Sequence, residues 1–276
     1  MKAGIEKAKV QFFYDLQRLR IQTKGRIARA IEYDNADLTD EDRKFFDMTG
    51  ESLDALEKHA LKEADRVVSV SPIYPWLREQ PGIGPTMAMV LVSQFCITDT
   101  REFLNIETGE IEIRKGAPRP SCFWSFAGLG VNDNGRAPKR EAGGEQKTSG
   151  KKGLPYNSWL RSKLIGVLGP SFLRAAKGEG HPKYRPIYDG LKHRLQHKGG
   201  CSLPKEKHGT GATWWPSGKK KAEPGDYCTD GHIHNQAMRY MVKMFLLDFW
   251  TEWRRVEGLP IVGPYGEDKL GLEHGW

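Results

Sequence analysis

A glycine-cornered turn between two apolar segments constrains the fold of this chain more than any other stretch. The turn is Pro81-Gly82-Ile83-Gly84-Pro85. Gly82 and Gly84 allow backbone angles that other residues rarely adopt, and Pro85 suits the first position of a helix because its missing N–H would have no partner there. The pattern predicts a helix-hairpin-helix over about 73–95. Backbone amides at such a corner can hold a phosphate oxygen; the alternative is a turn that only packs.

Two long charged helices are predicted ahead of this corner. Residues 4–34 keep an approximate apolar stripe at helical spacing, with Lys and Arg on the other face. The stripe runs through Val10, Phe13, Tyr14, Leu19, Ile27 and Ile31. Thr39 and the acids after it start a second helix over about 40–70. We assign 1–72 to an antiparallel coiled-coil hairpin, which either is a solvated scaffold or joins two copies as a homodimer.

The composition favours an acidic partner. The chain has 276 residues and a net charge of +8, and its isoelectric point near 9.2 favours a polyanion. Cys96 and Cys122 lie in apolar surroundings, which predicts buried, reduced thiols. The N-terminal residues lead into a charged helix, and no apolar run approaches the roughly 20 residues that span a bilayer. We therefore expect a cytoplasmic protein without a membrane partner.

Several elements are predicted after the corner. Apolar and polar residues alternate over 105–113, which predicts a small β-ribbon. A helix is expected over 157–168, and Gly169-Pro170 is expected to end it. Residues 232–257 are apolar nearly all round, so they are expected to form a central core helix.

Residues 73–262 are assigned to one helical domain, and 263–276 to a tail. Two basic insertions interrupt this domain, at 132–153 and 198–231. The first contains glycines and almost no large apolar group, so it cannot fold on its own. A basic loop beside a packed helix is typical of a nucleic-acid contact, because it can order on the phosphates that it neutralises. The alternative is an exposed, solvated loop.

The candidate contacts to RNA or DNA are the corner glycines, the cations of the basic half and one asparagine. They are Gly82, Gly84, Arg119, Arg136, Lys139, Arg140, Lys147, Lys151, Lys152, Asn157, Arg161, Lys163, Arg185, Lys192 and Arg194. Reversing the charges at 136, 139 and 140 is expected to weaken binding and flatten its salt dependence. Tyr184 and Tyr188 share one helical face; they either stack on bases or, as we expect, pack.

No metal or other cofactor is predicted. Cysteines and histidines gather near the second insertion, but zinc sites usually contain a close pair such as Cys-x2-Cys, and this spacing has none. The residues concerned are Cys201, His208, Cys228, His232 and His234.

Four segments recur in the same order in one known type of domain. They are Pro81–Pro85 with Ala88, Phe126–Gly130, Asn157–Leu164 and Ala237–Lys243. They resemble the C-terminal helix-hairpin-helix domain of bridge-RNA-guided insertion-sequence transposases, which is similar to the Nop domain of box C/D ribonucleoproteins. The layout over roughly 5–260 also resembles the Tas proteins of TIGR-Tas systems, which are prokaryotic or viral-encoded. The resemblance implies a mostly α fold, with a Nop-like domain after an antiparallel coiled coil, and a box C/D-like guide RNA as partner.

The chain departs from the transposases where they carry their chemistry. Their N-terminal domain holds acidic metal ligands on a sheet, whereas this N-terminus is predicted to be helical. The one candidate for their nucleophilic serine is Ser149, in a loop that supplies no base. The histidines of His232-Ile233-His234-Asn235 lead into a helix and not into a ββα nuclease unit. We therefore predict no enzymatic activity.

The sequence thus predicts an RNA-binding protein that forms a ribonucleoprotein with a guide RNA and targets DNA without cleaving it. A nuclease acting in trans is left open. The alternative is a transposase or recombinase of the bridge-RNA-guided family, or a remnant of one, that uses Ser149 on DNA strands. A third reading is a helix-hairpin-helix protein that binds DNA without RNA.

Overall fold

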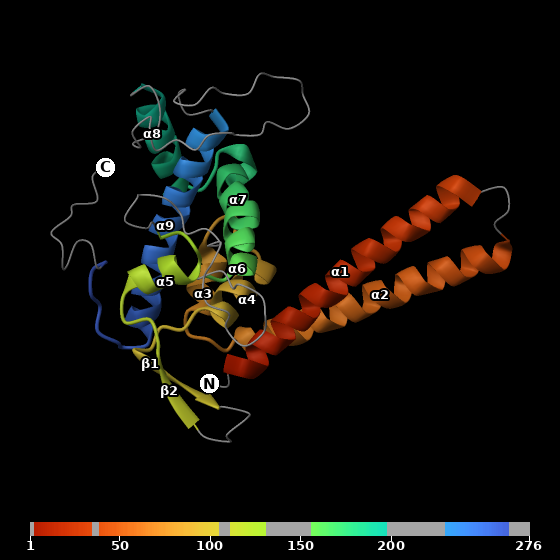
Figure 1. Ribbon diagram of the computed structural model, residues 1–276, viewed down its shortest axis with the longest axis horizontal. Coiled ribbons are helices and arrows are strands. Elements are labelled where there is room, and N and C mark those ends of the chain that lie inside the picture. The colour runs from red at the N-terminus through yellow and green to blue at the C-terminus, as the bar shows by residue number, and fades with distance from the viewer. Residues whose placement is uncertain (1–2, 35–38, 105–110, 131–155, 198–229, 265–276) are drawn as a thin grey trace, which may run out of the picture. The chain divides into compact units, whose positions relative to one another are not determined.

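The computed structural model describes residues 3–34, 39–104, 111–130, 156–197 and 230–264. These residues are mostly helical, which confirms the predicted fold class at that level (Figure 1). The chain divides into two compact units, one of Met1–Glu79 with Ile83–Phe95 and one of Gln80–Gly82 with Cys96–Trp276. The coiled coil, the Nop-like domain and the boundary at residue 72 remain predictions.

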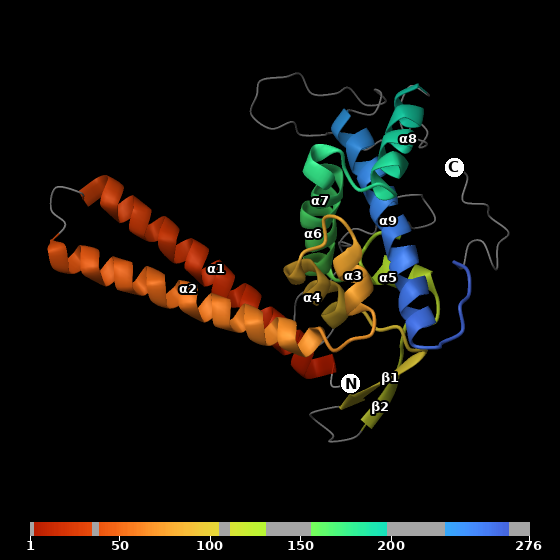
Figure 2. The same ribbon diagram turned by 180° about the vertical axis from the view of Figure 1, so that it is seen from behind.

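The first unit holds two long helices and two short ones. They are α1 (Ala3–Asp34), α2 (Asp40–Val68), α3 (Tyr74–Glu79) and α4 (Pro85–Gln94). The long pair is antiparallel, because Lys9 pairs with Glu63 at 3.1 Å and Lys24 pairs with Asp54 at 2.9 Å. Both views show the two helices side by side (Figures 1 and 2). Thr39 caps α2 in a capping box with Asp42, which confirms the predicted helix start.

The fully buried apolar residues of the long pair lie near one end of it. Val10 and Phe13 of α1 are buried, as are Ala60, Ala64 and Val68 of α2. Both helices contact α4, whose residues from Met87 to Gln94 are all buried. The predicted stripe is therefore only partly a core stripe. Leu19 and Ile31 belong to it by spacing, but their side chains are exposed.

The glycine corner links α3 to α4. Gly82 has φ +94°, and a Cβ there would lie 3.1 Å from the carbonyl oxygen of Ser171. Gly84 is the N-cap of α4 with φ −84° and ψ 172°, an extended conformation open to any residue. The sequence expectation is thus confirmed for Gly82 and wrong for Gly84. Pro85 occupies the first turn of α4 as predicted.

The second unit is arranged on α9 (Asp230–Val256). Helix α8 (Tyr184–His197) and the helix formed by α6 (Ser158–Lys163), η1 (Leu164–Leu168) and α7 (Gly169–Arg174) contact it, as does α5 (Pro120–Phe126). Aromatic rings fill the contact between α7, α8 and α9: Phe172 lies 4.9 Å from Tyr184 and 5.1 Å from Phe245, centroid to centroid. The predicted core helix is confirmed, with Met241, Phe245 and Trp250 inaccessible to solvent.

The chain stays helical through Gly169-Pro170, where the sequence predicted a break. Residues Leu164–Leu168 form a π turn, in which the Gly169 amide donates to the carbonyl of Leu164. A proline ring pushes against the carbonyl four residues before it. The wider π turn directly ahead of Pro170 lets the helix continue. Gly169 also allows the close approach of α9, because a Cβ there would lie 2.2 Å from the Met238 sulfur, which would have to move.

A two-stranded ribbon precedes α5. Strand β1 (Thr100–Leu104) pairs antiparallel with β2 (Ile111–Lys115), with Leu104 opposite Ile111. The predicted ribbon exists, but its first strand lies before residue 105 and its turn falls outside the described residues. A short 3-10 turn, η2 (Ala176–Gly178), follows α7. Cys96 and Cys122 are free thiols as predicted, although both are half-buried and not fully buried.

Candidate nucleic-acid interface

The structure describes only part of the predicted contact set. Arg136, Lys139, Arg140, Lys147, Lys151 and Lys152 lie outside the described residues, and so does Ser149. The rest of the set lies in the described part of the chain. Apart from the corner glycines, these residues lie on α6 and α8 or at the N-caps of α5 and α6.

Three of the described candidates make contacts that serve the fold. The Asn157 side-chain oxygen accepts the Leu160 amide at 3.0 Å and caps α6. Arg119, the N-cap of α5, donates to the carbonyl of Gly263 at 3.4 Å. Arg185 pairs with Asp189 at 2.6 Å and donates to the carbonyl of Leu173 at 3.0 Å. A role for these residues in binding remains a prediction.

Three other candidates lie over aromatic rings. The Arg161 guanidinium is 5.1 Å from the centroid of Tyr156. The Lys163 amine is 5.5 Å from the ring of Trp159, and the Lys192 amine is 5.7 Å from that of Tyr188. A ring attracts a cation through its quadrupole but does not neutralise its charge. Such a cation can still attract an anion.

Two cations of α9 join this group and were not among the predicted contacts. Arg239 and Lys243 are four residues apart, so they share one face of the helix. The Lys243 amine lies 4.4 Å from the Trp124 centroid, and the Trp124 indole donates to the Lys243 carbonyl at 3.0 Å. Burial lowers the pKa of Lys243. Cations at this spacing in an otherwise apolar helix were the signal available in the sequence.

Arg239 connects α9 to Arg161 of α6. Its pKa is lowered, first by burial and then by the positive charge of Arg161, while Tyr156 acts in the opposite direction. Arg161, Arg239 and Lys243 are called the cation cluster below. Each is half-buried, and in the described part of the chain none of them forms an ion pair with a carboxylate.

The Phe126–Gly130 segment holds the cluster in place. Gly128 has φ +67°, and a Cβ there would lie 2.5 Å from Tyr156, so the ring packs directly on the glycine backbone. The Asn157 amide donates to the carbonyl of Phe126 at 2.9 Å. These contacts join the end of α5 to the start of α6, and they place Tyr156 beneath Arg161. The glycine is needed both for its conformation and for this close approach.

The tyrosine candidates of α8 serve packing, and the histidines at the start of α9 make hydrogen bonds. Tyr184 and Tyr188 are buried, which confirms the expectation that they pack. The Tyr188 hydroxyl is hydrogen-bonded to Nδ1 of His234 at 2.6 Å, and Nε2 of His232 lies 2.9 Å from the Gln236 amide. Cys201, His208 and Cys228 lie outside the described residues. Within the described ranges, no three His, Cys, Asp or Glu side chains are grouped to hold a metal.

No protein-family model matches the chain, and no curated protein matches it. Among the described helices, none combines the length and apolar character needed to cross a membrane.

Proposed function

We propose that this chain binds a guide RNA and forms a ribonucleoprotein that targets DNA without cutting it. The observation that supports this most is the cation cluster, whose charges face rings and one another and have no carboxylate in the described part of the chain. Phosphates supply the missing negative charge. The resemblance to Nop-like Tas proteins favours a box C/D-like RNA, and base pairing by that RNA would read the target.

A homodimer is part of the proposal, and α1 supplies its surface. Ile5, Phe12, Leu19 and Tyr33 are exposed by 49%, 60%, 44% and 79%. The first three are spaced by seven residues, and Tyr33 follows fourteen later. Seven residues make nearly two helical turns, so these side chains lie along one line of the helix. Water-exposed apolar side chains in such a line favour a helical partner.

The same flank continues on α2. Lys9, which precedes Phe12 by three residues, pairs with Glu63, and Leu56 lies seven residues before Glu63. Leu56 therefore lies on the flank that carries Phe12, and its side chain is exposed by 51%. Apolar residues of both helices thus form one surface of the antiparallel pair.

The line on α1 is complementary to itself. Arg26 fills the gap between Leu19 and Tyr33 in the seven-residue series. When two copies of α1 lie antiparallel about a two-fold axis at Leu19, Arg26 of one copy faces Phe12 of the other. Ile5 then faces Tyr33. An arginine over an aromatic ring is attractive, so the one polar member of the series also finds a partner.

Purification of the chain from cells that carry its native flanking DNA tests the RNA. We expect a short structured RNA to co-purify and to resist DNase. A protein free of nucleic acid, or one that carries only DNA, would contradict the proposal. Arg161→Gln is expected to reduce the salt slope of RNA binding by about one, whereas Lys62→Gln, an exposed cation of α2, leaves it unchanged. Ser149→Ala is expected to leave binding intact.

Cysteine cross-linking tests the dimer. Leu19→Cys places a thiol on the two-fold axis, so oxidation should yield a covalent dimer. Ile21→Cys is the matched control, because Ile21 is exposed on α1 by 58% but lies outside the seven-residue line. Equal cross-linking of both variants, or a monomer at all concentrations, would rule out this surface.

A further inference from the structure

The cation cluster costs free energy in the absence of a ligand. Burial removes water from charged groups, and two guanidinium groups of like charge repel each other. Burial and the neighbouring Arg161 both lower the pKa of Arg239, and burial lowers that of Lys243. Elsewhere in the second unit the chain does supply carboxylates to its cations, as with Arg255 and Glu252 at 2.6 Å. The cluster therefore differs from its surroundings.

The donors of the cluster suit one kind of anion. A guanidinium group presents several N–H donors in a plane, which match the oxygens of a phosphate, and a lysine adds a point charge. Arg161 comes from α6, while Arg239 and Lys243 are one turn apart on α9. Helix α5 links the two helices, because Trp124 contacts Lys243 and Tyr156, which lies against Arg161, packs on Gly128 at the end of α5. Tyr156 and Trp124 form apolar walls behind Arg161 and Lys243.

We propose that Arg161, Arg239 and Lys243 form a binding site for one phosphate group of the RNA backbone. This inference rests on the proposed function and adds the residues and the ligand. The phosphate offsets the repulsion inside the cluster, so the site is more stable when occupied. These three residues should then lower the stability of the free protein and raise the stability of its complex with RNA.

The first readout tests the site without assuming RNA binding. Inorganic phosphate, titrated at constant ionic strength, is expected to raise the Tm of the wild-type chain. Arg239→Met and Lys243→Met keep apolar bulk and remove one charge each. We expect both variants to lose the phosphate-dependent rise and to melt at or above the wild-type Tm in its absence. Arg255→Met, on the same helix but paired with Glu252, is the control that should retain the rise.

RNA affinity gives the second readout. Each of the two variants is expected to bind the co-purified RNA about 10- to 100-fold more weakly, the range expected for a hydrogen bond between charged groups. Lys243→Arg keeps the charge and should restore most of the affinity. Arg161→Gln, on α6, serves in case an α9 variant fails to fold.

The outcomes separate this inference from the proposed function. Loss of both the phosphate effect and RNA affinity supports the site. Unchanged RNA affinity in all three variants overturns the site while the RNA-binding function stands. A third outcome is a phosphate-dependent rise in Tm that requires the cluster in a chain that carries no RNA. This outcome would support a phosphate site and would rule out RNA as the source of the bound phosphate. A lower Tm with normal phosphate response would show that these cations serve the fold alone.

Discussion

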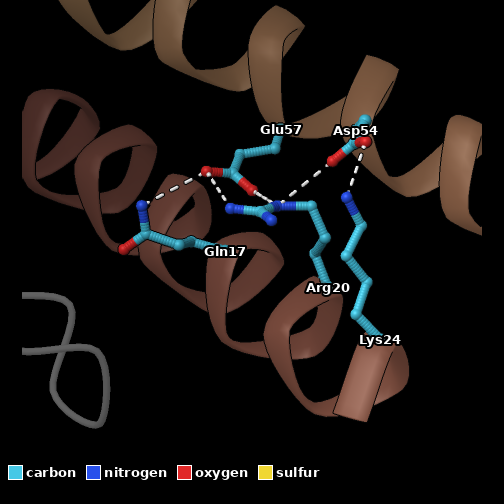
Figure 3. Close-up of polar contacts among 5 residues, drawn as sticks. All are labelled: Gln17, Arg20, Lys24, Asp54 and Glu57. Atoms are coloured by element: carbon cyan, nitrogen blue, oxygen red, sulfur yellow. Dashed lines mark hydrogen bonds and ion pairs between the residues drawn. The ribbon is translucent and has the colours of Figure 1, made fainter. Parts of the chain in front are cut away.

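The α1/α2 pair and the α5–α6–α9 region both contain lysines and arginines, but they surround them with different groups. Along the helical pair, Arg20 contacts both Glu57 and Asp54, Lys24 pairs with Asp54, and Gln17 donates to Glu57 (Figure 3). Around α9, Lys243 and Arg161 lie over rings. In the first region carboxylates neutralise these positive charges. In the second region the rings attract Lys243 and Arg161 but do not neutralise them.

This difference indicates which unit would bind an anion and which would bind a protein. A seam of paired, exposed charges contributes little stability and has no charge left for a phosphate. What the helical pair leaves unsatisfied is apolar surface, at Phe12, Leu19 and Leu56. In the second unit, what the described residues leave unsatisfied is the charge of the cation cluster, which has no carboxylate partner among them. The contrast favours a protein partner for the first unit and a polyanion for the second.

Arg254 is the strongest test of this contrast, because it is a buried cation of α9 that does have carbonyl and carboxylate partners. It donates to the carbonyls of Pro260 at 2.6 Å and Ile97 at 2.7 Å, and it pairs with Asp99 at 2.9 Å. Arg254→Gln is expected to lower the free energy of unfolding by roughly 2–4 kcal/mol, since each acceptor left unpaired costs about 1–3 kcal/mol.

Urea denaturation measures the effect, and Arg255→Gln on the adjacent, exposed residue is the control. A loss for Arg254→Gln no larger than that of the control would mean that the buried contacts of Arg254 contribute no more stability than the exposed pair of Arg255 with Glu252.

Asn157 tests whether a predicted contact belongs to the fold or to the interface. Asn157→Ala removes the acceptor that caps α6 and should cost about 1 kcal/mol. Asn157→Asp keeps the acceptor, so the free energy of unfolding should stay close to that of the wild type. A carboxylate also repels phosphates, so weaker RNA binding by the Asp variant with normal stability would place Asn157 at the interface. Unchanged RNA binding would mean that Asn157 acts in the cap and not at the interface.

Acid should weaken the two regions in different pH ranges, with the smallest effects of the three. In the second unit, burial is the first cause that lowers the pKa of His181, and its Nδ1 accepts the Lys183 and Tyr184 amides at 3.1 Å and 3.3 Å. The unfolded chain takes up this proton more readily, so stability falls as the pH drops below about 6.5.

In the first unit, hydrogen bonds from Arg66 and Lys9 lower the pKa of Glu63 to about 2. This carboxylate stabilises the helical pair above its ordinary pKa of 4.5 and loses that effect as the pH falls toward 2. Hydrogen exchange at pH 7, 5.5 and 3 should show α8 loosening before α1 and α2. The reverse order would contradict the assignment, and His181→Asn, which keeps a cap acceptor, should remove the early step.

The elements of this fold were largely predictable from local patterns. The capping box at Thr39, the first-turn Pro85 and the apolar run of α9 are local signals, and each predicted its element. The break at Gly169-Pro170 was wrongly predicted, because the π turn that accommodates the proline depends on five residues before it and on packing against α9. The exposure of Leu19 was missed for a similar reason, since periodicity shows which residues share a face and not what covers it.

Local sequence patterns were enough to predict most of the helices, the cap at Thr39 and the excess of positive charge. These follow from backbone stereochemistry and from residue counts. Which cations have a carboxylate partner depends on the tertiary structure. Arg161 and Arg239 are far apart along the chain, and their mutual repulsion arises because the fold brings them close in space. Whether a cation meets a carboxylate, a ring or another cation is set by that packing, and this is the property from which the proposed phosphate site is inferred.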